Sequence, residues 1–442
     1  MLIQFSVGNY LSFKEIVTLN LVAANINELE ESNIFRINKE ISVVKSAGIY
    51  GANASGKTNL FRAIQFMRSF VVNSSKESQA KEKIDTIPFR LNTESMRSPS
   101  FFEVLFVIED QKYRYGFEIS QEKVFKEWLF FTKIAKENVL FEREGDRINL
   151  DSRFKEGNGL QQKTRNNALF LSVVAQFNGE ISQKILHWFQ NLNVISGLRD
   201  ESYRGVGINL LKTSQDADFS LASKAFSKMI SEADLSIEDF KVSEFEIDAS
   251  TLPREMPIEV KREFLKTLKG KKSLKILTGH KKYDAENKLN GIEYFDFEED
   301  ESEGTKQYFR FAGPIIDTLH YGKVLFIDEL DAKLHTILTS TIVKLFNNKE
   351  TNPKNAQLVF TTHDTNLLAC KILRRDQIWF TEKDNFASTD LYSLVEYKIE
   401  KEGSESVKVR NDASFEKDYI RGRYGAIPFI GDFSKLWESK DV

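Results

Sequence analysis

The segment Gly51–Thr58, with the sequence GANASGKT, constrains the fold of this chain more than any other stretch. It matches the complete phosphate-loop pattern G-x-x-x-x-G-K-[ST]. The apolar residues 46–50 before it predict a short buried strand, and residues 58–67 after it carry apolar side chains at helical spacing. A strand, a glycine-rich turn and a helix N-terminus in this order are the context in which the pattern binds phosphates.

We expect the backbone N–H groups of this loop, with the positive end of the following helix, to hold an anionic triphosphate. Lys57 is expected to reach the β- and γ-phosphates, and Thr58 to offer its hydroxyl to Mg²⁺. The candidate nucleotide-binding residues of the loop are Gly51, Asn53, Ser55, Gly56, Lys57 and Thr58.

A second stretch, 323–327, is apolar after its first residue and predicts a strand that is covered on both faces. It ends in Asp328 and Glu329, whose carboxylates are expected at the C-terminal edge of the sheet, where ligands bind in open α/β folds. Asp328 suits Mg²⁺ binding through water, and Glu329 can orient or deprotonate an attacking water. The alternative is that both acids only cap a following helix, which the phosphate loop in the same chain disfavours.

Residues 356–360 predict another buried strand, and His363 follows its end. A histidine at this edge can contact a γ-phosphate, so His363 is a candidate catalytic residue. The alternative is a purely structural histidine, which its position disfavours.

A helix is predicted to begin near Ser302 and Gly304 and to run to Leu319. Its N-terminus would form a second anion-binding end, separate from the phosphate loop. This helix N-terminus could bind the phosphates of a nucleotide that is held by a second protomer.

Size and charge set broad limits on function. The chain has 442 residues, enough for two or three core-bearing units. Its net charge of −3 carries no overall nucleic-acid signature, so any DNA contact must be a local patch. The basic stretch 261–282 could contact phosphates. The acidic residues 296–303 can balance it, however, and a solvated face is the favoured interpretation.

The chain contains one cysteine, Cys370, which cannot form an intrachain disulfide and fits a reducing cytosol. We expect its side chain to be buried as a small hydrophobe beside Leu367 and Leu368. The sequence shows no secretory leader and no apolar run of about 18 residues. We therefore expect a cytoplasmic protein without a membrane anchor.

The remaining pattern is mainly that of antiparallel strands. Alternating residues predict an opening hairpin of strands 2–7 and 15–21, after which 24–40 are expected to form a loop. Helical spacing covers 166–188, and 200–290 show no clear pattern. Between the loop helix and this helical part, turn signals separate four strands of a predicted meander: 100–108, 112–120, 123–133 and 138–144.

The order of these motifs resembles the ATP-binding-cassette (ABC) superfamily, in its soluble DNA-repair and defence branch. Asn53 and the opening segment Asn9–Phe13 resemble RecF and the heads of structural-maintenance-of-chromosomes (SMC) proteins. Two features depart from the pattern: no Q-loop glutamine can be assigned, and Glu303 stands where transporters carry glycine. The resemblance implies a divergent signature motif at Ser302–Thr305, Walker B acids at Asp328 and Glu329, a D-loop at Asp331 and a switch histidine at His363.

More closely, the chain resembles the stand-alone ATPases of bacterial abortive-infection and anti-phage modules, of the RloA and AriA type. The resembling segments are 168–172, 329–335, 361–365, 373–378 and 422–428. The resemblance implies an α/β fold, an ABC-type P-loop ATPase head with a mixed sheet flanked by helices and an antiparallel β subdomain. The implied parts are an N-terminal lobe 1–165, a largely helical insert 166–295 between Walker A and the signature motif, and a C-terminal lobe 296–442.

In function, the resemblance implies ATP and Mg²⁺ as cofactors. It also implies that the chain is its own partner, either in a dimer whose two heads sandwich ATP or in a higher homo-oligomer. It further implies an immune sensor or scaffold that controls a separate effector, such as a Toprim-like or other nuclease, and that responds to a phage-encoded trigger. No membrane partner is expected.

Two alternatives remain open. One is a RecF-like or SMC-like DNA-binding clamp for repair, which would use the basic stretch 261–282. The other is a nuclease of the overcoming-lysogenisation-defect type, which carries a Toprim domain after the head. The short segment after His363 shows no clear Glu and Asp-x-Asp metal set, so this alternative is disfavoured.

Overall fold

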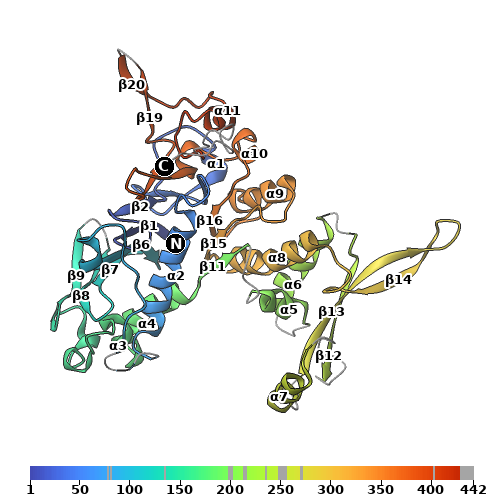
Figure 1. Cartoon of the computed structure of the whole chain (residues 1–442), viewed down its shortest axis with the longest axis horizontal. Helices are drawn as coiled ribbons and strands as arrows, with labels where there is room; N and C mark the ends of the chain where they lie inside the picture. The colour runs from blue at the N-terminus through green and yellow to red at the C-terminus, as the bar shows by residue number, and fades with distance from the viewer. Residues whose placement is uncertain are drawn as a thin grey trace, which may run out of the picture. The chain divides into compact units, whose positions relative to one another are not determined.

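The computed structural model describes residues 1–76, 79, 82–133, 136–197, 203–212, 217–233, 236–246, 256–268, 272–401 and 404–428. The chain divides into two compact units (Figure 1). Unit 1 comprises Met1–Gly197, Tyr321–Asp331 and Thr339–Val442, and unit 2 comprises Leu198–His320 and Ala332–Leu338. The division into an N-terminal lobe 1–165, an insert 166–295 and a C-terminal lobe 296–442 stays a prediction.

Unit 1 contains a six-stranded, mostly parallel sheet. Its order is β11 (Leu192–Ser196), β15 (Val324–Asp328), β16 (Gln357–Thr361), β5 (Ser46–Tyr50), β17 (Ile378–Lys383) and β18 (Thr389–Ser393). Only β18 runs antiparallel to its neighbour. The central strands β15, β16 and β5 are buried along their whole length, which explains their apolar sequences. Three strands were predicted, one before the phosphate loop, one before the acid pair and one before His363. The structure confirms all three, as β5, β15 and β16.

The second sheet of unit 1 is antiparallel throughout. Its order is β10 (Arg147–Leu150), β9 (Glu137–Glu144), β8 (Val124–Thr132), β7 (Gln111–Ile119), β6 (Ser100–Ile108), β1 (Leu2–Gly8) and β2 (Val17–Asn20). Buried and partly exposed residues nearly alternate along β6, as expected of a strand with one covered face. The predicted hairpin and meander are confirmed, and they belong to one sheet.

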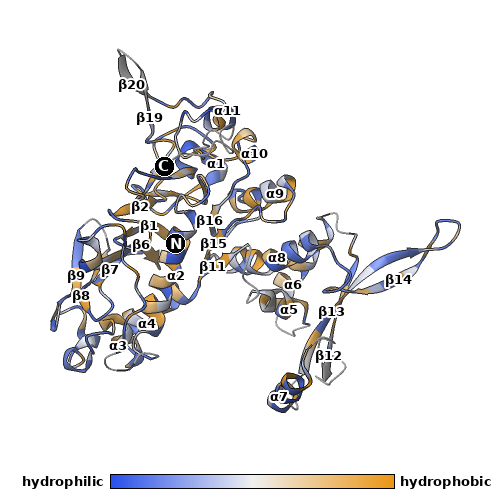
Figure 2. Cartoon of the chain, in the orientation of Figure 1, coloured by the Kyte–Doolittle hydropathy of each residue, from blue (hydrophilic) through white to orange (hydrophobic). Residues whose placement is uncertain are grey.

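A single hydrophobic core joins the two sheets of unit 1. Three helices contribute to it: α2 (Lys57–Asn73), α3 (Phe170–Gln176) and α4 (Glu180–Gln190). Phe66 of α2 contacts Tyr10 and Phe102 with ring centroids 5.5 and 5.1 Å apart, and Phe61 lies 5.6 Å from Phe326 of β15. Figure 2 shows apolar residues on the strands of both sheets. Much of the aromatic content of the chain therefore packs α2 between the sheets.

A buried ion pair fixes the start of α3. The side chains of Glu127 on β8 and Arg143 on β9 lie 3.7 Å apart and are 0% and 1% exposed. Glu127 accepts hydrogen bonds from the N–H groups of Phe170 (2.6 Å) and Leu171 (3.0 Å), while Arg143 donates to the carbonyl of Ala168 (2.7 Å). The carboxylate thus satisfies N–H groups that the first helical turn leaves without partners.

Unit 2 contains helices and a small antiparallel sheet. The helices are α5 (Arg204–Leu211), α6 (Ala217–Ser231), α7 (Ile258–Leu268) and α8 (Glu303–Tyr321), and the sheet order is β12 (Asp239–Glu246), β13 (Lys272–Tyr283) and β14 (Leu289–Asp296). The helix predicted near Ser302 is confirmed as α8. The insert was predicted to be largely helical, and the structure adds the three strands of this small sheet to its helices. Charged side chains on β13 obscured its alternating pattern.

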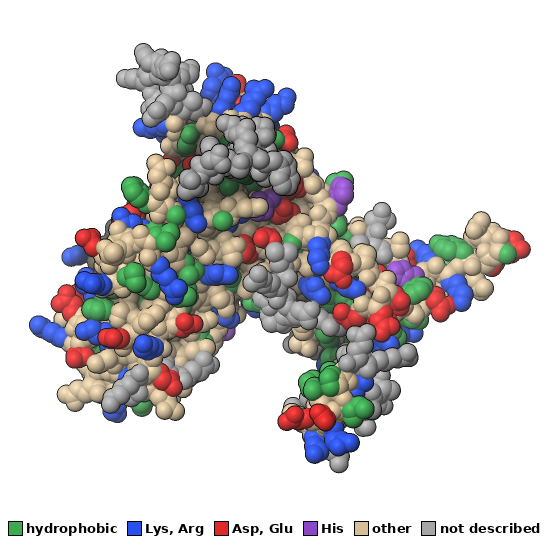
Figure 3. All heavy atoms as spheres, viewed as in Figure 1, with side chains coloured by type: hydrophobic (Ala, Val, Ile, Leu, Met, Phe, Trp, Pro, Cys, Tyr) green, Lys and Arg blue, Asp and Glu red, His purple; other side chains and the backbone are tan. Residues whose placement is uncertain are grey.

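Acidic partners balance the basic stretch of unit 2. Lys275 pairs with Asp296 at 2.8 Å, and two further lysines of β13 pair with acids at 2.6 Å each, in Lys281–Glu238 and Lys282–Glu293. Basic and acidic side chains are interspersed over this hairpin on the face that Figure 3 shows. Lys269 and Lys271 lie outside the described residues. The pairing favours the interpretation of a solvated face.

Two local predictions are wrong. Residues 24–40, expected to form a loop, contain α1 (Glu30–Asn33) and β3 (Ile34–Arg36), which pairs with β4 (Ser42–Val44). These elements are too short, and their sequence too polar, for apolar residues to recur at helical or strand spacing. Cys370, expected to be buried, is exposed, because it directly follows α10 (Asn366–Ala369), whose two leucines fill the core.

The remaining elements of unit 1 are α9 (Thr336–Asn347), which begins in unit 2, β19 (Lys398–Lys401), β20 (Ser404–Lys408) and α11 (Phe415–Ile420). Within the described parts of the chain, no helix has the length and apolar character needed to cross a bilayer.

The buried pair yields a test of stability. Glu127→Ala leaves Arg143 buried without its carboxylate, so the free energy of unfolding should fall by about 3–5 kcal/mol in urea denaturation. Glu118→Ala on neighbouring β7 is the control, because its pair with Lys126 lies at the surface. The control should change stability by less than about 1 kcal/mol. Equal losses in both variants would contradict the role of the buried pair.

Candidate functional site

The phosphate loop connects the end of β5 to the start of α2. Gly51, Ala54 and Gly56 all have positive φ, at 156°, 62° and 117°. A Cβ on Gly56 would lie 2.4 Å from the hydroxyl of Thr389, and one on Gly51 would lie 2.5 Å from the carbonyl of Thr381. Both glycines of the motif are therefore required by the close approach of β17 and β18, as well as by their backbone conformation.

The side chain of Lys57 lies over its own loop. Its Nζ donates to the carbonyls of Gly51 (2.6 Å) and Ala52 (3.0 Å). Burial lowers the pKa of Lys57 to about 8, although Asp328 and Glu329 act in the opposite direction. The ammonium is thus held by the backbone of the loop, where the charges of Asp328 and Glu329 act on it.

The structure places Thr58 in the first turn of α2, exposed to solvent, and Asn53 is exposed as well. Ser55 is buried, and its hydroxyl lies 2.7 Å from that of Thr381. Thr58 is therefore accessible to a metal ion, whereas the Ser55 side chain supports the loop.

A chain of hydrogen bonds supports the loop from β18. Asn59 Nδ2 donates to the hydroxyl of Ser12 (2.8 Å), the hydroxyls of Ser12 and Thr389 lie 2.8 Å apart, and Thr389 donates to the carbonyl of Ser55 (2.8 Å). Sequence reasoning missed the roles of Ser12, Thr381 and Thr389. No local motif marks them, because they meet the loop only when the strands are paired.

The two acids lie at the C-terminal edge of the parallel strands. Asp328 is buried at the end of β15, and Glu329 follows with a φ of 59°. Thr361, at the end of β16, donates its hydroxyl to Asp328 Oδ1 (2.7 Å) and accepts a hydrogen bond from the N–H of Glu329 (2.7 Å). The position of Glu329 in the left-handed region is unusual for a residue with a side chain and is common at functional sites.

Asp331 and His363 complete this edge. The carboxylate oxygens of Asp331 accept hydrogen bonds from the N–H of His363, at 3.3 Å each. Partial burial lowers the pKa of His363, and the charge of Lys57 lowers it further, while Asp331 and Asp328 raise it. The structure therefore brings together, at one sheet edge, Lys57, Asp328, Glu329, Asp331 and His363.

Ser302 and Gly304 belong to unit 2. The Ser302 hydroxyl accepts a hydrogen bond from the N–H of Thr305 (3.1 Å), which makes Ser302 the cap of α8. Glu303 pairs with Lys333 (2.7 Å) and with Lys306 (3.4 Å), and these lysines lower its pKa. Ser302 itself is exposed at this helix end.

The residues of unit 1 fit a magnesium nucleotide. The loop has no Cβ at Gly51 and Gly56, Thr58 is open to solvent, and Asp328 presents a carboxylate at the same edge. The described residues include no group of three or more His, Cys, Asp or Glu side chains placed to hold a metal ion. Mg²⁺ needs only one or two protein ligands beside the phosphates and water, so this donor set suits it.

Two comparisons with known proteins found a match. The family model described as "AAA domain, putative AbiEii toxin, Type IV TA system" matches residues 46–369, a range that includes the phosphate loop, both acids and His363. Among solved structures, the chain is similar to the SMC head domain from Thermotoga maritima. The identity is 12%, the match covers 89% of this chain and 98% of that chain, and the TM-score is 0.40. No curated protein matches the chain.

The lowered pKa of Lys57 gives a test by pH. With a pKa of about 8 in the free protein, the ammonium loses most of its charge between pH 7 and pH 9. The dissociation constant for ADP, measured by calorimetry, should therefore rise roughly tenfold over this range. Lys57→Arg keeps its charge throughout and should show a flat profile. The same pH dependence in both proteins would show that Lys57 is not its source.

Proposed function

We propose that this chain, which belongs to the family of AAA domains described as putative AbiEii toxin of a type IV TA system, is an ATP-hydrolysing switch of the ABC type. The observation that carries the proposal is the convergence of five residues at one edge of a parallel sheet. They come from the loop after β5, the end of β15 and the end of β16, and they are Lys57, Asp328, Glu329, Asp331 and His363.

In this proposal, the loop N–H groups and Lys57 bind the β- and γ-phosphates of ATP. Thr58 and Asp328 hold Mg²⁺, which neutralises charge on the phosphates when bound. Glu329 orients or deprotonates the attacking water. His363 contacts the γ-phosphate, and Asp331 holds the backbone of His363 in place through the observed hydrogen bonds.

A second copy of the chain completes the site. Ser302 is exposed at the start of α8, where the backbone N–H groups of the first helical turn point outward. In the proposed sandwich dimer, Ser302 and Gly304 of one copy contact the γ-phosphate bound by the other. ATP then favours closure, because only the closed state makes both sets of phosphate contacts.

The switch controls a separate toxic effector in a cytoplasmic anti-phage module. The family description and the resemblance to abortive-infection ATPases support this role. The chain acts as the sensor or scaffold, a nuclease such as a Toprim-like protein is the effector, and a phage-encoded protein is the trigger. A DNA-repair clamp has weaker support, because three lysines of β13 are already paired with acids.

Dimerisation is tested in a variant that binds ATP without turning it over. The mass of Glu329→Gln, measured by light scattering, should double on addition of Mg-ATP. Adding Ser302→Asp should prevent the doubling, since Asp still caps α8 but repels the γ-phosphate of the second copy. A mass that doubles equally in both proteins would contradict the contact between copies.

The role in defence is tested in cells that carry the whole encoding module. Lys57→Ala should reduce phage protection to the level of cells without the module, because the loop no longer holds ATP. Lys76→Ala is the control, since Lys76 is exposed beyond the end of α2. Phage protection is measured by plaque counts. Equal protection by Lys57→Ala and by the unchanged chain would contradict the proposal.

A further inference from the structure

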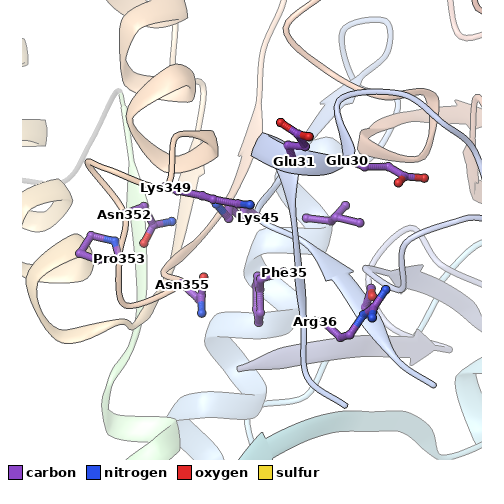
Figure 4. A pocket seen from close by; sticks show the side chains of 11 residues that line it. Glu30, Glu31, Phe35, Arg36, Lys45, Lys349, Asn352, Pro353 and Asn355 are labelled. Atoms are coloured by element: carbon purple, nitrogen blue, oxygen red, sulfur yellow. The ribbon is translucent and has the colours of Figure 1, made fainter. Parts of the chain in front are cut away.

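Unit 1 contains a cavity of about 500 Å³ that is separate from the phosphate loop (Figure 4). Its walls come from α1, β3, β4 and the segment between α9 and β16. Lys45 directly precedes β5, and Asn352–Asn355 end two residues before β16 begins. The phosphate loop and His363 follow the other ends of these strands. The cavity therefore lies at the N-terminal edge of the parallel strands, opposite the proposed ATP site.

A buried cation lines this cavity. Lys45 is 1% exposed, and the one hydrogen bond of its ammonium within the described structure goes to the carbonyl of Asn347, at 3.3 Å. Burial lowers the pKa of Lys45 to about 8, and the neighbouring Lys349 acts in the same direction. A buried ammonium with a second cation beside it is costly unless an anion compensates both.

The other charged residues of the cavity provide no such compensation. Lys349 and Arg36 form no ion pair with any residue that the structure describes, and the same holds for the two carboxylates, Glu30 and Glu31. Three cations and two carboxylates give the lining a formal charge of 3 − 2 = +1. Figure 4 shows Lys45 and Lys349 next to each other, whereas Glu30 and Glu31 come from α1.

We propose that this cavity binds a small phosphorylated molecule of about the size of a nucleoside monophosphate. Lys45 and Lys349 hold the phosphoryl group, and Glu30 and Glu31 accept hydrogen bonds from hydroxyl or amino groups on the rest of the ligand. Phe35, which is buried in the same wall, offers an aromatic surface to a ring. The volume falls within the range of small-molecule sites.

The two carboxylates favour a small molecule over a nucleic acid. A nucleic-acid strand carries a phosphate at every nucleotide, so Glu30 and Glu31 would repel the phosphates next to the bound one. A ligand with a single phosphoryl group avoids this repulsion and uses the carboxylates as acceptors.

The experiment is calorimetric titration of AMP, adenosine and inorganic phosphate into the full chain carrying Lys57→Ala, which disables the phosphate loop. AMP should bind, and adenosine should not. Adding Lys349→Gln should weaken AMP binding about tenfold or more, because one charged hydrogen bond is lost. Lys349 is exposed, so this variant is expected to fold even if a change at buried Lys45 does not.

Lys344→Gln, an exposed lysine of α9 outside the cavity, is the matched control and should leave AMP binding unchanged. No binding of AMP, or binding unaffected by Lys349→Gln, would overturn the site. Inorganic phosphate that binds as tightly as AMP would overturn the role given to Glu30 and Glu31. A short 5′-phosphorylated oligonucleotide that binds more tightly than AMP would replace the small ligand with a nucleic-acid end.

Discussion

The acidic half of the site depends on one hydroxyl group. Thr361 donates a hydrogen bond to Asp328 and accepts one from the N–H of Glu329, both at 2.7 Å. One side chain on β16 therefore fixes a carboxylate and the next peptide of β15. Glu329 needs such a restraint because its left-handed backbone carries a conformational cost. A shift of β16 against β15 would move both acids together, which is the kind of coupling that a nucleotide switch uses.

The parts of the fold that the sequence predicted are those where a local pattern reflects a general physical need. Strands covered on both faces must be apolar, so β5, β15 and β16 could be found from their composition. Alternation revealed the antiparallel sheet of β6 to β9. The phosphate loop, the acids and His363 could be placed at one edge because parallel strands present their C-terminal ends on the same side.

The remaining features arise from contacts between distant segments, which no local pattern shows. Thr389 supports the phosphate loop only because β18 pairs beside it, more than three hundred residues later in the chain. Glu127 and Arg143 look like ordinary charged residues of a meander, yet they are buried together under α3. The sheet of unit 2 was not predicted because lysines of β13 pair with acids on β14, and these charged side chains obscured the alternating pattern. The cavity around Lys45 likewise combines two segments that are distant in sequence.

The position of Lys57 has a consequence for selectivity among nucleotides. Its ammonium already donates hydrogen bonds to the carbonyls of Gly51 and Ala52. A ligand must therefore replace these two hydrogen bonds in order to bind the ammonium. A nucleotide with one phosphate has too few phosphate oxygens to bind the loop N–H groups and also to replace both carbonyls as acceptors for Lys57. One with a second or third phosphate replaces both carbonyls and gains the full charge of the lysine. The loop therefore selects nucleotides by their number of phosphate groups, and cellular AMP would compete poorly with ATP for this site.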